Sequence, residues 1–153
     1  MKPEVRMGSQ RGFSLIELMV VVVIITILTS VALPSFQAYV MRSKRSVAKS
    51  ILHQVAARQE QFFMDNRQYA TSMVQLGYPA NPLYLNQEGD MVTASSTQRV
   101  YEISIARPTV RVYTLSATPQ LGQASKDSEC ATFTLTESGV KGVSGSGGAA
   151  KCW

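Results

Sequence analysis

The sequence is poor in the side chains on which most catalytic and metal sites depend. It has one histidine, His53, two cysteines and ten acidic residues among 153. No Ser/His/Asp set and no pair of carboxylates stands out, and two cysteines with a single histidine do not make a zinc site. The Gly-rich segment 142–148 lacks the Lys-Ser/Thr that ends a phosphate-binding loop. We therefore expect neither an enzyme nor a protein that holds a metal or a cofactor.

Strong charge is lacking as well. The net charge is +5, from 15 basic and 10 acidic residues. Residues 1–12 carry +2 of this charge, and the rest of the chain carries +3. A surface this mildly basic does not by itself indicate nucleic-acid binding. The length allows one domain.

The longest apolar run extends from Phe13 to about Ala38 and contains one charged side chain, Glu17. It exceeds the roughly 20 residues that cross a bilayer, and in lipid only a helix satisfies its own backbone in a single span. No Ala-x-Ala cleavage site follows the run; the small residue, Gly12, precedes it. Cleavage at Gly12 would leave the apolar helix on the mature protein.

The two cysteines, Cys130 and Cys152, follow this export-type N-terminus, which favours one disulfide in an oxidising compartment. The alternative is two free buried thiols. A disulfide would close a loop of about 20 residues and contribute about 3 kcal/mol. Basic residues flank the apolar run on both sides, so the positive-inside rule alone does not orient the helix. The cysteines need an oxidising compartment, and we therefore expect the C-terminal side to be exported. We expect the basic side chains after the run to be solvated or near headgroups: Arg42, Lys44, Arg45 and Lys49.

Beyond Pro34 the apolar residues recur at helical spacing, which extends the helix to about Met64. The predicted apolar stripe comprises Phe36, Val40, Val47, Ile51, Val55 and Phe62. A loop follows at Asp65–Thr97, with one short helix near Thr71–Leu76. The tail at Gly142–Ala150 is flexible by composition.

Alternating apolar residues predict strands at Val100–Ala106, Val110–Ala117 and Ala131–Thr136, with a short fourth strand at Val140–Val143 as an option. Arg107-Pro108-Thr109 is the predicted turn between the first two. The expected fold class is α+β: a long N-terminal helix packed on an antiparallel sheet of three to four strands, with a C-terminal disulfide-closed region.

The stretch from Arg11 to Leu18, followed by the apolar run and Pro34, resembles the N-terminus of type IV pilins of the type IVa branch. The resemblance implies a leader of residues 1–12, which a prepilin peptidase cuts between Gly12 and Phe13, and N-methylation of Phe13. Residues 13–38 would be the membrane anchor and later the filament core. Residues 39–153 would be a globular head that includes the second half of the helix. The start at Met1 or Met7 stays open.

The later stretches resemble the PilE-type minor pilins: Ala57–Phe63, Tyr113–Pro119 and Cys130–Trp153. This implies a minor subunit of a type IVa pilus that acts in pilus assembly, twitching motility and adhesion. It would sit in the bacterial inner membrane as a single span with its head in the periplasm, and in the extracellular pilus afterwards. Its partners would be other pilin subunits, the prepilin peptidase and the inner-membrane pilus assembly machinery.

Three alternatives stay open. One is a major pilin, and one is a type II secretion pseudopilin, which would typically bind calcium. The third is a DNA-uptake competence pilin, which needs one basic face on the head. The candidate residues for that face are Arg99, Arg107, Arg111, Lys126 and Lys141.

Glu17 needs a partner, because a carboxylate near a membrane segment is costly. We expect the amine of Phe13, freed by cleavage, to pair with Glu17 of its own helix or of a neighbouring subunit, which would set the register of assembly. The alternative is a carboxylate that reaches the headgroups. Pro34 removes one helix hydrogen bond, and no glycine lies between Phe13 and Pro34, so the weak point of the helix is predicted at Pro34 alone.

Overall fold

The computed structural model describes residues 12–153, so the predicted leader lies outside the described residues except for Gly12. The long helix α1 runs from Leu15 to Asn66 and continues through Pro34. Both ends lie within two residues of the predicted ones. Contacts divide the chain into two compact units, one ending at Ala38 and the other spanning Tyr39–Trp153.

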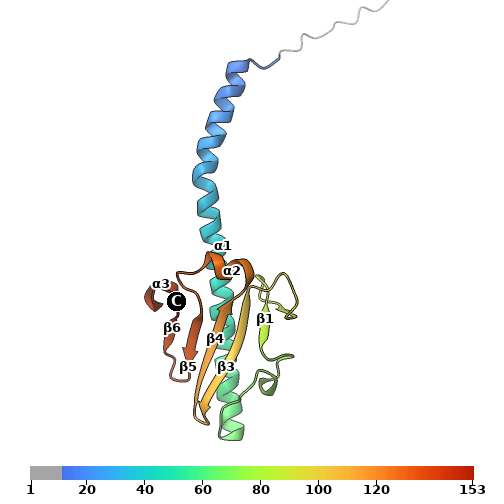
Figure 1. Ribbon diagram of the computed structural model, residues 1–153, viewed down its shortest axis with the longest axis vertical. Helices are drawn as coiled ribbons and strands as arrows, with labels where there is room; N and C mark the ends of the chain where they lie inside the picture. Colours follow the sequence, from blue (N-terminus) through green and yellow to red (C-terminus); the bar gives the residue numbers. More distant parts are fainter. Residues whose placement is uncertain (1–11) are drawn as a thin grey trace, which may run out of the picture. The chain divides into compact units, whose positions relative to one another are not determined.

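The second unit is built on one antiparallel sheet in the order β2-β1-β3-β4-β5-β6 (Figure 1). Its strands are β1 (Leu83–Leu85), β2 (Met91–Val92), β3 (Tyr101–Thr109), β4 (Val112–Pro119), β5 (Phe133–Thr136) and β6 (Lys141–Val143). Figure 1 shows the C-terminal half of α1 lying along this sheet. The predicted class, a helix on an antiparallel sheet with a disulfide-closed C-terminal region, is confirmed.

The sheet has six strands where three to four were expected. The additional strands, β1 and β2, have three and two residues. Segments this short show no alternation, and they lie in the region predicted as a loop. The turn between β3 and β4 falls at Val110 and Arg111, later than predicted. Pro108 stays within β3. The register shifts around it, between Ala106 and Thr109, because proline cannot donate a hydrogen bond to the ladder.

The core forms between α1 and the sheet. Ile51 and Val55 of the predicted stripe are buried, as expected, but Phe36 is 65% exposed and Val40, Val47 and Phe62 are only partly buried. The alternating strand residues are buried as predicted: Tyr101, Ile103, Tyr113, Leu115, Ala117, Phe133 and Leu135. The buried stripe of α1 therefore begins later than expected, at Ala48.

Three short helices complete the head: the 3-10 helix η1 (Val74–Leu76), which falls within the predicted short helix, and α2 (Leu121–Lys126) and α3 (Ala149–Cys152), which were not predicted. The Gly-rich tail is paired with the chain around the first cysteine. Gly145 and Gly147 donate backbone hydrogen bonds to the carbonyls of Cys130 and Glu129 at 3.2 and 2.8 Å. A Cβ atom on Gly145 would overlap the Glu129 carbonyl, so the close approach requires glycine.

Candidate functional site

The first part of the candidate site is the start of α1. Gly12 and Phe13 precede the helix, and Phe13 is 85% exposed. The first helical hydrogen bond runs from the Leu18 amide to the Ser14 carbonyl at 3.2 Å. Glu17 lies in the first turn, where a carboxylate interacts favourably with the helix dipole. Cleavage after Gly12 would therefore place an amine one turn from this carboxylate.

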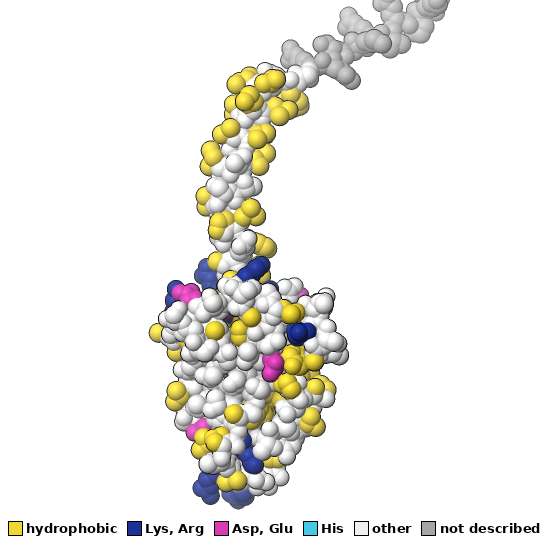
Figure 2. All heavy atoms as spheres, in the orientation of Figure 1, with side chains coloured by type: hydrophobic (Ala, Val, Ile, Leu, Met, Phe, Trp, Pro, Cys, Tyr) yellow, Lys and Arg dark blue, Asp and Glu magenta, His cyan; other side chains and the backbone are white. Residues whose placement is uncertain are grey.

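The helix surface that follows is apolar and exposed. An 18-residue window has a mean hydropathy of 2.7 and none of it is buried, so the segment is long and apolar enough to cross a membrane. Figure 2 shows hydrophobic side chains covering the N-terminal part of α1. None of the residues from Leu15 to Leu33 is buried by the rest of the described chain. Such a surface is stable only against lipid or other protein.

The hydroxyl groups of this segment bond to the helix itself. Thr26 donates to the Val22 carbonyl at 2.8 Å, and Thr29 donates to the Ile25 carbonyl at 2.9 Å. Ser30 donates to the carbonyl of Ile27. Pro34 has no amide proton to offer the Ser30 carbonyl, four residues earlier. Hydroxyl back-bonding slightly weakens and bends a helix, so we expect these hydroxyls to add to the weakness predicted at Pro34.

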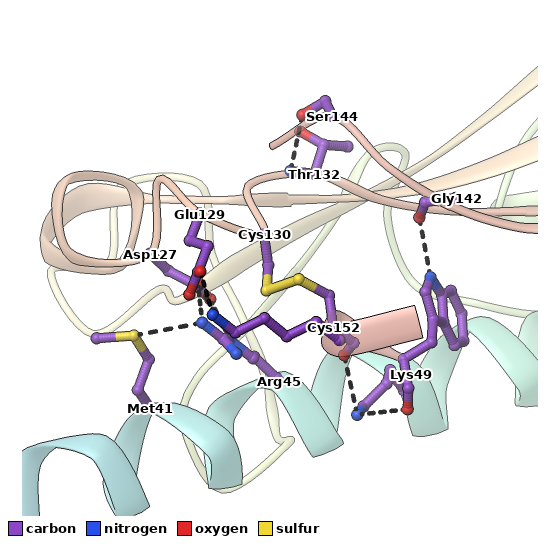
Figure 3. Close-up of a disulfide and its surroundings, with 12 residues drawn as sticks. Met41, Arg45, Lys49, Asp127, Glu129, Cys130, Thr132, Gly142, Ser144 and Cys152 are labelled. Atoms are coloured by element: carbon purple, nitrogen blue, oxygen red, sulfur yellow. Dashed lines mark hydrogen bonds and ion pairs between the residues drawn. A yellow bond between two sulfur atoms is a disulfide. The ribbon is translucent and has the colours of Figure 1, made fainter. Parts of the chain in front are cut away.

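The second part of the site is the disulfide between Cys130 and Cys152 (Figure 3). The two Cα atoms are 5.7 Å apart, and both cysteines are buried. The predicted pairing is confirmed, and the alternative of two free thiols is wrong. The bond joins the segment after α2 to α3, so it closes the tail onto the sheet.

Two basic side chains of α1 hold this closed region. The guanidinium of Arg45 binds the fully buried carboxylate of Asp127, and this hydrogen bond raises the pKa of Arg45. Lys49 donates to the carbonyls of Cys152 and Trp153, both at 3.3 Å. Burial, followed by the charges of Arg45 and Lys141, lowers the pKa of Lys49. Arg45 and Lys49 were predicted at headgroups or in solvent; they bind the head instead.

Comparison with known sequences now decides the family. Residues 34–134, well over half of the chain, match a family described as "Type IV minor pilin ComP, DNA uptake sequence receptor". Residues 7–33 match the prokaryotic N-terminal methylation motif. The chain belongs to the type IV pilin family. The match to the methylation motif includes Gly12 and Phe13, the predicted processing residues.

Several other pilins are similar to this one. The type IV major pilin protein PilA of Myxococcus xanthus is 40% identical over 56% of this chain and 38% of its own length. The fimbrial protein EcpC of Eikenella corrodens is 36% identical over 60% of both chains. The type IV wide pilus major component PilA4 of Thermus thermophilus is 32% identical over 59% of this chain and 70% of its own. The pilin thus spans less than two thirds of the length of the first two relatives.

Family and fold together establish where this pilin is found. The apolar N-terminal helix anchors it in a membrane before assembly, and the assembled form is an extracellular, fimbrial pilus. Pilins are structural proteins, and this one is not an enzyme.

The basic residues predicted to share one face of the pilin head lie in three places. Arg99 and Lys126 line a pocket beside α2. Arg107 and Arg111 lie at the opposite end of the β3–β4 hairpin, whose register places its turn at Val110 and Arg111. Lys141 lies over the Trp153 ring, 5.1 Å from its centroid. The expected single basic face is therefore not formed.

Two fully buried polar residues of the pilin head were not predicted from the sequence. Gln59 is fully buried on α1, and its side-chain amide exchanges two hydrogen bonds with the Ala70 backbone, at 2.8 and 3.1 Å. Asp127 is buried beside α2. Gln59 stands at the position expected of an apolar residue, four after Val55, and that spacing is the only signal in the sequence. No local pattern distinguishes Asp127 from an exposed aspartate.

Proposed function

We propose that this pilin is a structural subunit of a type IVa pilus that assembles with other pilin subunits after a prepilin peptidase removes its leader. The observation that carries the proposal is the exposed apolar surface of α1, of which the described chain covers none. Lipid covers this surface before assembly, and helices of neighbouring subunits would cover it in the filament. The inner-membrane pilus assembly machinery would act in the transfer of the helix from the lipid to the filament.

Glu17 would set the register of this packing. It is the single charged side chain between Phe13 and Ala38, and it is exposed in the first turn of α1. In an apolar filament core its carboxylate requires a positive partner. The methylated amine of Phe13, created by cleavage after Gly12, is the nearest candidate in sequence. Pairing to a neighbouring subunit would reject wrongly staggered subunits, because each wrong stagger leaves two charges unpaired.

The test replaces Glu17 with Gln, which keeps the shape and removes the charge. We expect the Glu17→Gln pilin to be processed and retained in the membrane, but to be depleted from sheared pili. Asp65→Asn removes one negative charge from an exposed position at the other end of α1 and is the matched control. Mass spectrometry of the pili reports cleavage after Gly12 and the methyl group on Phe13. Normal incorporation of Glu17→Gln would refute the role of Glu17.

We further propose that this pilin is a minor subunit of the pilus, with roles in pilus assembly, twitching motility and adhesion. The support for this is the description of the family that matches residues 34–134, whereas the similar PilA and PilA4 are named as major components. Quantitative mass spectrometry of sheared pili tests it: the pilin should be present at a small fraction of the most abundant subunit. A dominant share would assign it as the major pilin.

A second candidate function is DNA binding in DNA uptake. It is favoured by the description of the matching family as a DNA uptake sequence receptor. Either basic place, Arg99 with Lys126 or Arg107 with Arg111, would supply the phosphate contacts. Binding of a labelled DNA duplex at increasing salt concentration tests this. Each lost phosphate contact reduces the slope of the logarithm of the binding constant against the logarithm of the salt concentration by about one. Comparing Lys126→Gln with Arg111→Gln would identify the place that contacts DNA.

A further inference from the structure

A polar pocket of about 300 Å³ opens beside α2. Its walls come from four segments that are distant in the sequence: Lys44 of α1, residues 87–88 between β1 and β2, residues 97–100 before β3, and residues 120–126 around α2. The volume is at the small end of the range for ligand pockets. Val100 and Leu121 are its only apolar side chains among the described residues, so the pocket suits a charged or polar ligand.

The pocket carries excess positive charge. Lys44, Arg99 and Lys126 face one carboxylate, Glu88, so the lining has a net charge of +2. Glu88 already accepts a hydrogen bond from the side chain of Gln87 at 2.7 Å. The ion pairs of the described chain are Arg45–Asp127 and Lys151–Glu129, so none of the three cations is paired with a carboxylate there.

The floor of the pocket is fixed by a buried polar network. Gln123 lines the pocket and is 5% exposed. Its side-chain nitrogen donates to the Asp127 carboxylate at 3.0 Å and to the Tyr101 hydroxyl at 3.3 Å. Asp127 is in turn held by Arg45. These partners hold the side chain of Gln123 in place without a ligand.

The rim holds a strained residue. Leu121 has φ = 47°, a left-handed conformation that a bulky side chain rarely adopts, and it is 47% exposed. Non-glycine residues in this region are concentrated at ligand sites and switch regions, where the surrounding structure maintains them. Leu121 is also the first residue of α2, so the start of this helix lines the pocket.

We propose that this pocket binds a phosphate monoester. At neutral pH the second phosphate proton is largely lost, so the dianion matches the +2 lining. The guanidinium of Arg99 can bind two phosphate oxygens at once, and the two lysines supply further charge. The amides of Gln87, Gln98 and Gln120 line the same space and suit hydroxyl groups beside the phosphate. A diester carries one charge and matches less well.

The monoester is small and polar, of about the size of a glycerol phosphate. It can come from a soluble metabolite or from the headgroup of a phosphate-terminated lipid. Both sources share the same chemistry, and the proposal does not depend on DNA binding by the pilin.

Calorimetry of the full-length pilin in a neutral detergent, at about 150 mM salt to screen non-specific binding, tests the proposal. The soluble probe is sn-glycerol 3-phosphate, and the lipid probe is monomeric dihexanoyl phosphatidic acid. We expect saturable binding of one molecule per chain. Equal affinity for both probes assigns the phosphate alone as the ligand, and clearly tighter binding of the lipid assigns a headgroup. A dinucleotide without a terminal phosphate is the diester probe and should bind more weakly than either.

Lys126→Gln, at an exposed position of the pocket, should weaken binding about tenfold, and Arg99→Gln at least as much. Arg111→Gln removes the same charge from the far end of the hairpin and should leave affinity unchanged. The proposal is overturned if no monoester binds saturably, if the dinucleotide binds as tightly as the monoesters, or if Arg111→Gln weakens binding as much as Lys126→Gln. Lys44→Gln provides a second exchange on another wall, so misfolding of one variant leaves the test intact.

Discussion

Arg45 and Asp127, 82 residues apart in the sequence, form an ion pair in which Nε of the guanidinium lies 3.0 and 3.1 Å from the two carboxylate oxygens and Nη2 lies 2.6 Å from Oδ1. The Asp127 side chain is fully buried, and that of Arg45 is 13% exposed. The pair joins α1 to the segment that leads from α2 to the disulfide. Cys130 follows Asp127 by three residues, so the pair and the disulfide act on the same stretch of chain.

Asp127→Asn should destabilise the head by about 3–5 kcal/mol, because it leaves the largely buried Arg45 without a counter-charge. Urea unfolding of the full-length pilin in detergent measures this through Trp153, the single tryptophan. Glu129→Gln is the matched control: its pair with Lys151 is exposed and should matter little. Equal effects of the two variants would contradict a special role for the buried pair.

Gln59→Leu should be costly although leucine is the better core residue by hydrophobicity. The exchange leaves the buried amide and carbonyl of Ala70 without partners, at about 1–3 kcal/mol for each group. Gln61→Leu, at an exposed position of the same helix, is the control and should be nearly neutral. Urea midpoints of the two variants provide the comparison. A neutral Gln59→Leu would mean that water replaces the lost bonds.

Stability should fall at alkaline pH, and Tyr101 and Tyr113 are the two tyrosines with the largest shifts among those whose pKa is raised by burial. Burial is the largest cause that raises the pKa of both hydroxyls, from an ordinary value of 10.0. Above pH 10 the unfolded chain releases these two protons while the native chain keeps them, so the free energy of unfolding decreases as pH rises. Below pH 10 both states are protonated and the two groups add no pH dependence.

Urea unfolding at pH 9 to 12 in unit steps, about the range where tyrosine ionises, measures this slope. Tyr113→Phe should reduce it by removing one of the two groups. Tyr39→Phe, at a position 70% exposed, is the control and should leave the slope unchanged. If the slope were the same in all three proteins, another group would be responsible for the alkaline loss.

The segment Thr26–Pro34 should open more readily than the rest of α1. Amide hydrogen exchange in detergent should show faster exchange there than at Ile51, Leu52 and Val55, which are buried in the head. Pro34→Ala should increase protection of the segment, by up to about 3 kcal/mol, because alanine restores the missing hydrogen bond. Unchanged protection in Pro34→Ala would place the weakness in the hydroxyl groups instead.

Periodicity and spacing predicted much of this pilin. The alternation through Tyr113, Leu115 and Ala117 placed β4, and the two cysteines gave the disulfide, because one buried face and one covalent bond are both visible in the order of residues. The apolar run located the exposed part of α1. The alternation and the apolar run are local patterns, whereas the disulfide joins cysteines 22 residues apart and was predictable because the chain has no other cysteine.

The remainder depended on contacts between distant segments. β1 and β2 exist because β3 offers an edge with which Leu83–Leu85 pairs, and three residues carry no pattern of their own. Arg45 was predicted in solvent or near headgroups because its partner, Asp127, lies 82 residues away in the sequence. The Gly-rich tail looked flexible by composition, but its glycines allow the backbone to lie against Glu129. In each case the partner, not the local sequence, determines the structure.

The hydroxyls of Thr26, Thr29 and Ser30 donate to carbonyls of α1 itself, so they need no hydrogen-bond partner from lipid or from another protein. Each proton already has an acceptor within the helix, so leaving the bilayer breaks no bond to lipid and entering a filament requires none from a neighbour. Transfer between two apolar media then changes little hydration free energy along most of the segment. In the assembly that we propose, the same helix would serve in both environments, and we expect the carboxylate at its first turn to be the group for which the two environments differ most.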